Sequence, residues 1–311
     1  MWIYVVRRLL YGIPILLGVT VITFLLLNVF GGDPAIQALG KAASQADIDK
    51  LRHDYGLDKP LFFQYIDYLR QIVTFEFGHS FVTHEPVTKL LARSAMPSLS
   101  FTIPALVITT LLAVSIGLVA AFFRGSRIDR GLMITAVLGM SISFLVYIVV
   151  GQYLLAYVWP LFHIHGYEAG LVERWQYLIL PIVILVIVGL GYDTRFYRSV
   201  FAEEMSRDHV TTAYAKGAGQ ARIMFVHVLK NALVQIITRV MISLPFLVTG
   251  SLLLESFFGI PGLGDALLVA LNTADFPVVK AYTVMISLLF ILSTIANDIL
   301  YALVDPRIRL E

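Results

Sequence analysis

Few side chains in this sequence have the spacing that catalysis or metal binding requires. The chain has no cysteine, which excludes disulfides, thiolate nucleophiles and cysteine-based metal sites. His84-Glu85 lacks the second histidine of the His-Glu-x-x-His zinc motif, and no Gly-x-x-x-x-Gly-Lys-Ser/Thr loop is present to bind ATP. His163 and His165 have no third ligand, which is more typical of an interfacial turn than of a metal site. We therefore expect no catalytic residue and no metal site.

Two aspartates, Asp193 and Asp265, invite comparison with a proteolytic dyad. With their neighbours and with Pro104-Ala105-Leu106, they resemble the three motifs of intramembrane aspartyl proteases. Such an enzyme needs its aspartates a few ångströms apart, sharing a proton. Hydropathy instead separates them by an apolar span, roughly 30 Å across. The Pro-Ala-Leu motif also precedes the other two, whereas it comes last in that family, so we reject a protease.

A polar, basic segment from residue 207 to residue 233 stands out in the apolar C-terminal half of the chain. It is predicted to form two short helices with a break at Gly217 and Gly219, where glycine tolerates the turn. Small side chains at Thr212, Ala213 and Ala215 leave a narrow helix that the groove of another protein could accept. The alternative is an ordinary basic loop held by lipid headgroups.

The composition is that of an integral membrane protein. Of 311 residues, 58% are hydrophobic and 14% charged, against about a quarter charged in soluble domains. A net charge of +2 gives no reason to expect a nucleic-acid partner. Spanning a bilayer takes roughly 20 apolar residues. The fold class is therefore all-α with six transmembrane helices, at about residues 9–30, 98–123, 132–158, 176–198, 231–254 and 281–304.

The first apolar run is too long for a signal peptide and lacks a small-x-small cleavage site, so we expect a retained helix. Basic residues set the orientation. They precede the first run, lie between the second and third and between the fourth and fifth, and close the chain. Both termini are thus expected in the cytosol. Residues 31–97 form a long outer loop, whose amphipathic helices would lie on the membrane face or pack against the protein's own spans.

The basic segment resembles the "EAA" loop of ABC-importer permeases, in the version of the dipeptide/oligopeptide/nickel permease family. Ala215-Lys216-Gly217 and His227…Asn231-Ala232-Leu233 match that version, whereas Thr211 and Thr212 replace the Glu-Ala of the general pattern. By this resemblance the segment couples the permease to an ATPase. The residues assigned to the coupling loop are Asp208, Thr211, Thr212, Ala213, Ala215, Lys216, Gly217, His227, Leu229 and Asn231.

The resemblance extends along nearly the whole chain. Arg7-Arg8-Leu9-Leu10 with Gly32-Asp33-Pro34 matches the start of that family, although Gly31 stands where proline is usual. Tyr55-Gly56-Leu57-Asp58-Lys59-Pro60 matches its outer loop and Asp305-Pro306-Arg307-Ile308-Arg309 its ending. Between the last two spans, the family has an element near its outer gate, which survives at membrane depth only where protein or water covers it. Its matching residues are Glu255, Phe258, Pro261, Gly262 and Gly264.

The resemblance implies a type I ABC importer permease fold with an extra N-terminal span. Its expected parts are residues 1–94, a core at 95–304 with the coupling loop at about 199–230, and a cytosolic tail at 305–311. The implied partners are a second homologous permease, two cytosolic ATPases that bind ATP and Mg, an external binding protein and the lipid bilayer of a bacterial or archaeal cytoplasmic membrane. Peptides are the family's commonest cargo; nickel chelates, glutathione and opines also occur. A secondary transporter is the alternative, but no internal repeat is found.

Two charges fall inside predicted spans, where an ionisable residue usually has a partner. Arg239 lies about 12 Å into the fifth span and Asp298 about 10 Å from the same end of the sixth. We therefore hypothesise an ion pair between them. Asp193 is a competing partner for Arg239, and the alternative is that Arg239 snorkels to the headgroups.

Overall fold

The computed structural model describes residues 2–32, 35–36, 44–54, 56–170, 172–249 and 252–304. Most of these residues are helical and none of them forms a β-strand, as predicted. The matches at Asp33-Pro34 and Tyr55 and the tail at 305–311 lie outside the described residues. The long helices are α1 (Trp2–Leu25, continued by η1, Leu26–Phe30), α5 (Val87–Phe122), α8 (Arg174–Glu204), α11 (Lys230–Thr249) and α14 (Phe276–Val304).

Among the described residues, five helices are long and apolar enough to cross a membrane, and two bent helix pairs also qualify. One pair is the predicted third span, in which α6 (Arg127–Ser141) meets α7 (Phe144–Gly151, continued by η2, Gln152–Val158) at 90°. Ile142 and Ser143 adopt extended conformations there, and neither glycine nor proline marks the break. The other pair is α12 (Leu252–Phe258) and α13 (Leu263–Asn272), bent by 92°.

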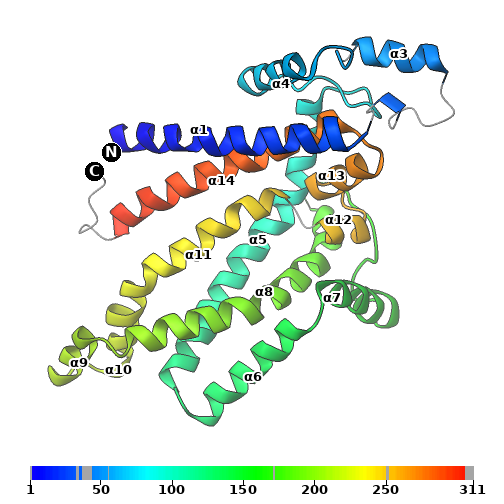
Figure 1. Ribbon diagram of the computed structural model, residues 1–311. Coiled ribbons are helices and arrows are strands. Elements are labelled where there is room, and N and C mark those ends of the chain that lie inside the picture. The colour runs from blue at the N-terminus through cyan, green and yellow to red at the C-terminus, as the bar shows by residue number, and fades with distance from the viewer. Residues whose placement is uncertain are drawn as a thin grey trace.

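The long helices run between two ends of the molecule (Figure 1). One end, here the α9 end, holds the start of α1, the end of α14 and the short helices α9 (Asp208–Ala215) and α10 (Gln220–Arg222). The opposite end, the α13 end, holds α13, α12 and the helices α3 (Gln45–Asp54) and α4 (Leu61–Thr74). Helix α5 runs unbroken past Ser94, where the expected boundary between the outer segment and the core falls.

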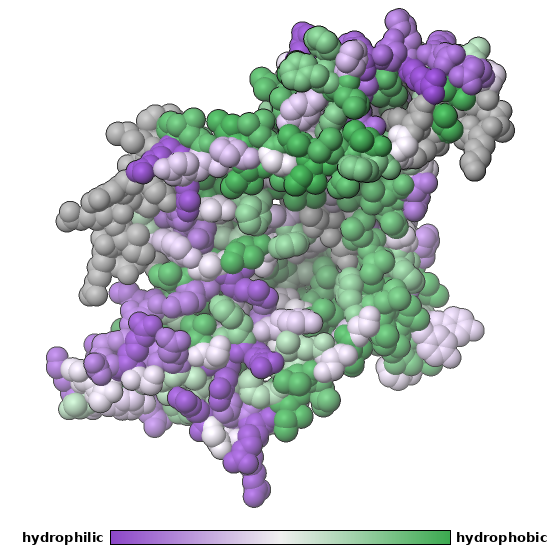
Figure 2. Space-filling model, viewed as in Figure 1, coloured by the Kyte–Doolittle hydropathy of each residue, from purple (hydrophilic) through white to green (hydrophobic). Residues whose placement is uncertain are grey.

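Helices α5 and α8 form the centre of the bundle and approach closely at two glycines. A Cβ on Gly117 would lie 3.0 Å from the backbone nitrogen of Arg198, and one on Gly189 would lie 2.8 Å from Thr109. Lipid is as apolar as a core side chain, so such close packing, rather than removal from water, holds membrane helices together. Elsewhere, large apolar side chains cover the outside of the helices and form the hydrophobic surface seen in Figure 2.

Helix α4 packs against the protein's own spans, one of the two expected arrangements. Tyr68 and Ile72 are buried in a cluster with Phe24 of α1 and Tyr282 of α14. The ring of Tyr65 meets that of Phe24 edge-on at 5.4 Å. The opposite side of α4 is apolar and exposed, at Leu61, Phe62, Phe63, Ile66 and Val73. Helix α4 is thus fixed to α1 and α14 along one side.

Candidate functional site

The break in the basic segment is confirmed at Gly217. Helix α9 ends there with φ +77° at Gly217, and the two following N–H groups bond back into the helix, Gly217 to the carbonyl of Tyr214 at 2.9 Å and Ala218 to that of Ala213 at 3.1 Å. This pair of bonds is a Schellman cap, which requires the left-handed conformation that glycine adopts readily. Gly219 is extended, so only Gly217 needs to be glycine for conformational reasons.

The second predicted short helix is not separate from the fifth span. Helix α10 passes directly into the π-helical segment η3 (Ile223–Leu229) and then into α11, so that Gln220–Leu247 forms one helical rod. His227 and Leu229 are half-buried on this rod, where it leaves α9. The segment therefore consists of a short helix, a glycine turn and the start of a long span.

One side of α9 is open to solvent. Val210 and Ala213 are buried against Phe201 and Ile223. The exposed residues Asp208, Thr211, Thr212 and Ala215 stand at positions i, i+3, i+4 and i+7 and so share one side, with Lys216 and Gly217 exposed at its end. Ala213, although assigned to the coupling loop, is therefore part of the hydrophobic core. The six exposed residues named above form a narrow, accessible strip.

A buried carboxylate, Glu204, holds α9 to the end of α8. Its Oε2 lies 3.1 Å from Arg207 Nε and its Oε1 lies 3.2 Å from His209 Nε2. That histidine nitrogen accepts from Asn231 Nδ2 at 2.9 Å rather than donating to Glu204, and Asn231 Nδ2 also donates to the carbonyl of His227 at 2.8 Å. Asn231 thus joins α11 to α9. Neither Glu204 nor His209 was predicted from the sequence, although an acidic residue at the junction of a span and a basic segment was an available signal.

A second clamp at the α9 end joins α6 to α8. Arg198 donates from Nε and Nη2 to the two oxygens of Asp129, at 3.1 and 2.8 Å, and Gly125 N–H donates to the same carboxylate at 2.9 Å. Asp129 is buried, and Ser126 caps its helix in a Ser-x-x-Asp arrangement. This bidentate pair fixes the 123–126 turn and was also missed from the sequence.

The hypothesised pair between Arg239 and Asp298 is wrong. Arg239 Nε donates to Asp193 Oδ1 at 2.8 Å, and its guanidinium lies 5.8 Å from the ring centre of Phe196. Asp298 instead receives Arg8 Nε at 2.8 Å. The depth predicted along the spans placed Arg239 near both candidate aspartates. The rotation of α11 about its own axis, however, directs the Arg239 side chain towards α8. Helix α1, which packs on α14, brings Arg8 to Asp298.

At the α13 end, Glu255 is fully buried and caps a helix with its carboxylate. Ser98 Oγ donates to Oε1 at 2.7 Å, and Asp265 N–H donates to Oε2 at 2.9 Å. Leu263 N–H donates to Ser98 Oγ at 2.7 Å. The carboxylate therefore faces the N-terminus of α13, where the helix dipole favours negative charge. One turn further along α5, Thr102 Oγ1 lies between the carbonyls of Ser98 and Leu247.

The glycines of this gate element make room for that carboxylate. A Cβ on Gly262 would overlap Glu255 Oε2 and Ser98 Oγ, and a Cβ on Gly264 would lie 2.9 Å from Glu255 Oε2. Phe258 is buried in the core, whereas Pro261 is exposed. Because Gly262, Leu263 and Gly264 are buried, the element is a packed junction of α5, α12 and α13 rather than a free surface turn.

No group of three metal-binding side chains occurs among the residues the structure describes. His163 packs against the ring of Tyr177, at 4.6 Å between centres, and His165 lies against Gly259. Both histidines lie exposed in the connection between η2 and α8.

The described helices thus have an exposed strip on α9 at one end and a packed junction of α5, α12 and α13 at the other. Two family models match the chain: the binding-protein-dependent transport system inner membrane component at residues 113–310 and its N-terminal region at residues 1–102. The chain belongs to this family of ABC-importer permeases and has its type I fold.

Curated relatives align with this chain along almost their whole length. A Brucella abortus protein named as a peptide transport system permease is 33% identical over 99% of both chains. A Sinorhizobium fredii protein named as a peptide ABC transporter permease is 32% identical over 99% of this chain and 100% of its own. The glutathione transport system permease protein GsiC of Salmonella typhi is 35% identical over 98% of both.

Proposed function

We propose that this chain is one of two permease subunits of an ATP-driven importer of short peptides. The observation that carries the proposal is the exposed strip of α9, which ends at the Gly217 cap and is anchored to α8 and α11 by Glu204 and Asn231. A strip of small side chains on a firmly held helix suits docking into the groove of another protein. The relatives named for peptide transport support the cargo.

In this proposal the α9 end faces the cytosol, together with both termini, and the α13 end faces outward. Arg207, Lys216, Arg222 and Lys230 support that orientation, because cytoplasmic loops carry an excess of basic residues. Two ATPase subunits bind the coupling loops of this chain and of a second, homologous permease. An external binding protein delivers the peptide at the opposite end, and the membrane is the cytoplasmic membrane of a bacterium or archaeon.

The chain performs no bond chemistry in this mechanism. ATP and Mg are bound by the ATPase subunits, whose closure moves α9 and whose hydrolysis of ATP resets it. Because α9 is tied to α8 and α11, its displacement is passed to the bundle and to the gate element. Alternating access follows from coupling between these two ends.

Glutathione is the second candidate cargo, because GsiC is about as similar to this chain as the peptide permeases are. Glutathione is itself a tripeptide, so the two candidates share charged termini and size. Purifying the external binding protein and identifying its ligand by mass spectrometry distinguishes them.

The coupling role is tested with Gly217→Glu. A matched control is Gly125→Glu, because Gly125 also has a positive φ, +80°, and neither glycine has a neighbour within 4 Å of the added Cβ. Both changes should carry a similar backbone strain of about 1–2 kcal/mol. We expect Gly217→Glu to abolish transport and stimulation of ATP hydrolysis by the binding protein at near-normal expression, and Gly125→Glu to do much less. Equal effects of the two changes would remove α9 from the coupling role. Transport that continues without ATPase subunits and collapses with the ion gradient would indicate a secondary transporter.

A further inference from the structure

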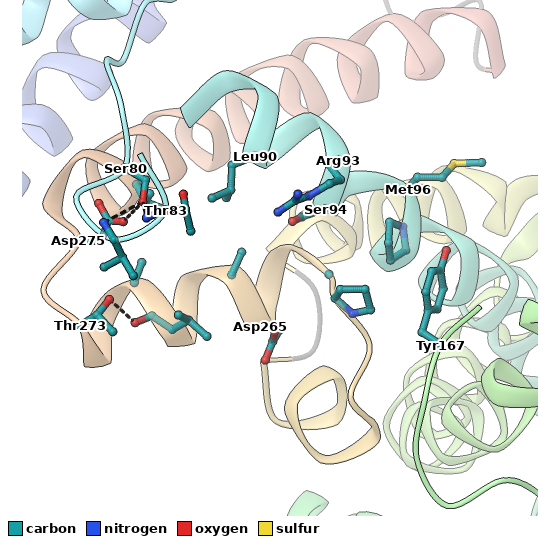
Figure 3. A pocket seen from close by; sticks show the side chains of 18 of the residues that line it. Ser80, Thr83, Leu90, Arg93, Ser94, Met96, Tyr167, Asp265, Thr273 and Asp275 are labelled. Atoms are coloured by element: carbon teal, nitrogen blue, oxygen red, sulfur yellow. Dashed lines mark hydrogen bonds between the residues drawn. The ribbon is translucent and has the colours of Figure 1, made fainter. Parts of the chain in front are cut away.

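A pocket of about 490 Å³ opens at the α13 end between α5 and α13 (Figure 3). Its other walls come from the loop before α5 and from the connection that precedes α8, and the gate residues Pro261 and Gly262 line it as well. This volume falls within the range of roughly 300–1,000 Å³ that is typical of small-molecule sites. The pocket is mostly apolar but contains charged side chains of both signs.

The first charge is Arg174, whose side chain is buried, with the residue only 7% exposed. Its Nε donates to the carbonyl of Gly170 at 3.1 Å and its Nη2 to that of Ala169 at 2.8 Å. In the part of the chain that the structure describes, no carboxylate lies within ion-pair distance of it. Buried charges in proteins are normally paired, whereas this guanidinium has no counter-ion among the described residues.

The second charge is Asp265, at the start of α13. Its backbone N–H is fixed by Glu255, but no described cation pairs with its carboxylate. Arg93 lies across the pocket on α5 (Figure 3) and has only a 3.5 Å contact with Glu85. Asp275, also in the wall, is already occupied by Ser80 and by the N–H of Phe81. The available groups are therefore two guanidiniums and one carboxylate.

We propose that this pocket binds the cargo, a short zwitterionic peptide, on its way to the gate. The proposal rests on the proposed import function. The peptide carboxylate is held by Arg174 and Arg93, since guanidinium binds carboxylates with directed hydrogen bonds. The peptide ammonium is held by Asp265, and the backbone lies along the apolar wall. Because the wall includes Pro261 and Gly262, an occupied pocket touches the gate element directly.

The test uses the assembled importer in lipid nanodiscs without its binding protein, so that only the membrane subunits can bind. The probes are trialanine, N-acetyl-trialanine and trialanine amide, with affinity measured by equilibrium binding of radiolabelled peptide. In the wild type, acetylation and amidation should each raise Kd by about tenfold or more, as for loss of a charged hydrogen bond. Asp265→Asn should remove only the penalty for acetylation, and Arg174→Gln only that for amidation.

Arg93→Gln is a second variant for the carboxylate end, because Arg93 has a side chain 66% exposed and its replacement should not disturb folding. Arg70→Gln, on the exposed side of α4, is the matched control and should change neither penalty. The pocket is refuted if trialanine does not bind saturably, or if the penalties in Asp265→Asn and Arg93→Gln equal those of the wild type. Cross-linking of a cysteine at Thr83 to the binding protein, with unchanged penalties, would assign the pocket to that protein instead.

Transport in cells separates the two proposals. If the importer takes up trialanine with its binding protein but the pocket variants behave as the wild type in both assays, the pocket is wrong and the import function stands. If the wild type takes up no peptide and binds none, the import function fails and the pocket fails with it.

Discussion

Glu255 on α12 and Ser98 on α5 are joined by a hydrogen bond of 2.7 Å from Ser98 Oγ to Glu255 Oε1, entirely within the protein interior. The same serine oxygen receives the N–H of Leu263, and the other carboxylate oxygen receives that of Asp265. One buried carboxylate therefore fixes the angle between α12 and α13 against the central helix. These hydrogen bonds have to break for α13 to move away from α5.

Gly262→Leu should disturb these hydrogen bonds. A side chain at Gly262 overlaps Glu255 Oε2 and Ser98 Oγ, so the carboxylate would be displaced and the N-terminus of α13 left uncapped, which costs about 1–3 kcal/mol for each unsatisfied buried group. We expect ATP hydrolysis by the assembled importer to lose its dependence on the binding protein. Gly18→Leu is the control, because nothing lies within 4 Å of a Cβ there. Unchanged coupling at normal expression would contradict a gating role for the element.

A charge swap between Arg239 and Asp193 should restore stability that either single reversal removes. Arg239→Asp alone leaves two carboxylates facing each other and should lower stability by about 1–3 kcal/mol, less than in a fully buried pair, because the Arg239 side chain is 39% exposed. Thermal unfolding of the detergent-solubilised importer measures the recovery in Arg239→Asp with Asp193→Arg. The combination of Arg239→Asp with Asp298→Arg should show none; recovery there would reinstate the pair that the structure lacks.

Glu204→Gln should loosen α9 without disturbing the bundle. The change removes the negative charge that pairs with Arg207 at 3.1 Å, and an ion pair with a half-exposed arginine contributes about 0.2–1 kcal/mol. Amide hydrogen exchange in α9 should rise, and stimulation of ATP hydrolysis by the binding protein should fall. Glu203→Gln is a matched control, because its side chain is 74% exposed and contacts Arg207 only at 3.4 Å. Similar exchange in the two variants would show that Glu204 does not hold the helix.

Single cysteines test the orientation of the chain, and the absence of native cysteine keeps the background low. Cysteines at Ser44 and Thr273, at the α13 end, should react with an impermeant thiol reagent added to spheroplasts. Cysteines at Ser126 and Ser206, at the α9 end, should react only after the membrane is permeabilised. Labelling of Ser126 from outside would reverse the proposed orientation.

The features that were predicted correctly from the sequence are those that depend on local patterns of residues. Apolar runs gave the helices, and glycine at position 217 gave the end of α9, because both depend on neighbouring residues only. The 90° bend at Ile142 and Ser143 was not predicted, because neither residue is a helix breaker and because apolar composition does not give the direction of the helix axis. Helix α7 packs against α8 and α12, and contacts of this kind cannot be read from the sequence of one segment.

Contacts between distant segments were predicted less well. Depth along a span placed Arg239 beside two candidate aspartates, but the rotation of α11 chose Asp193. Arg8 was interpreted as a topology signal and as part of a family motif, but its contact with Asp298 was not predicted. The residues of the gate element were predicted from the family resemblance. The helix-capping geometry of Glu255 was not predicted, because it depends on Ser98, which lies 157 positions away.

The continuity of α10, η3 and α11 makes the coupling segment one arm of a lever. The 28 residues from Gln220 to Leu247 span roughly 42 Å at 1.5 Å per residue, so a tilt of about 5° at one end displaces the other by roughly 4 Å. At the far end of this helix, the carbonyl of Leu247 accepts a hydrogen bond from Thr102. Thr102 lies one helical turn from Ser98, which donates a hydrogen bond to Glu255. If α9 transmits the movement of an ATPase, as proposed, this geometry would magnify a small rotation beside α9 at the junction of α5, α12 and α13.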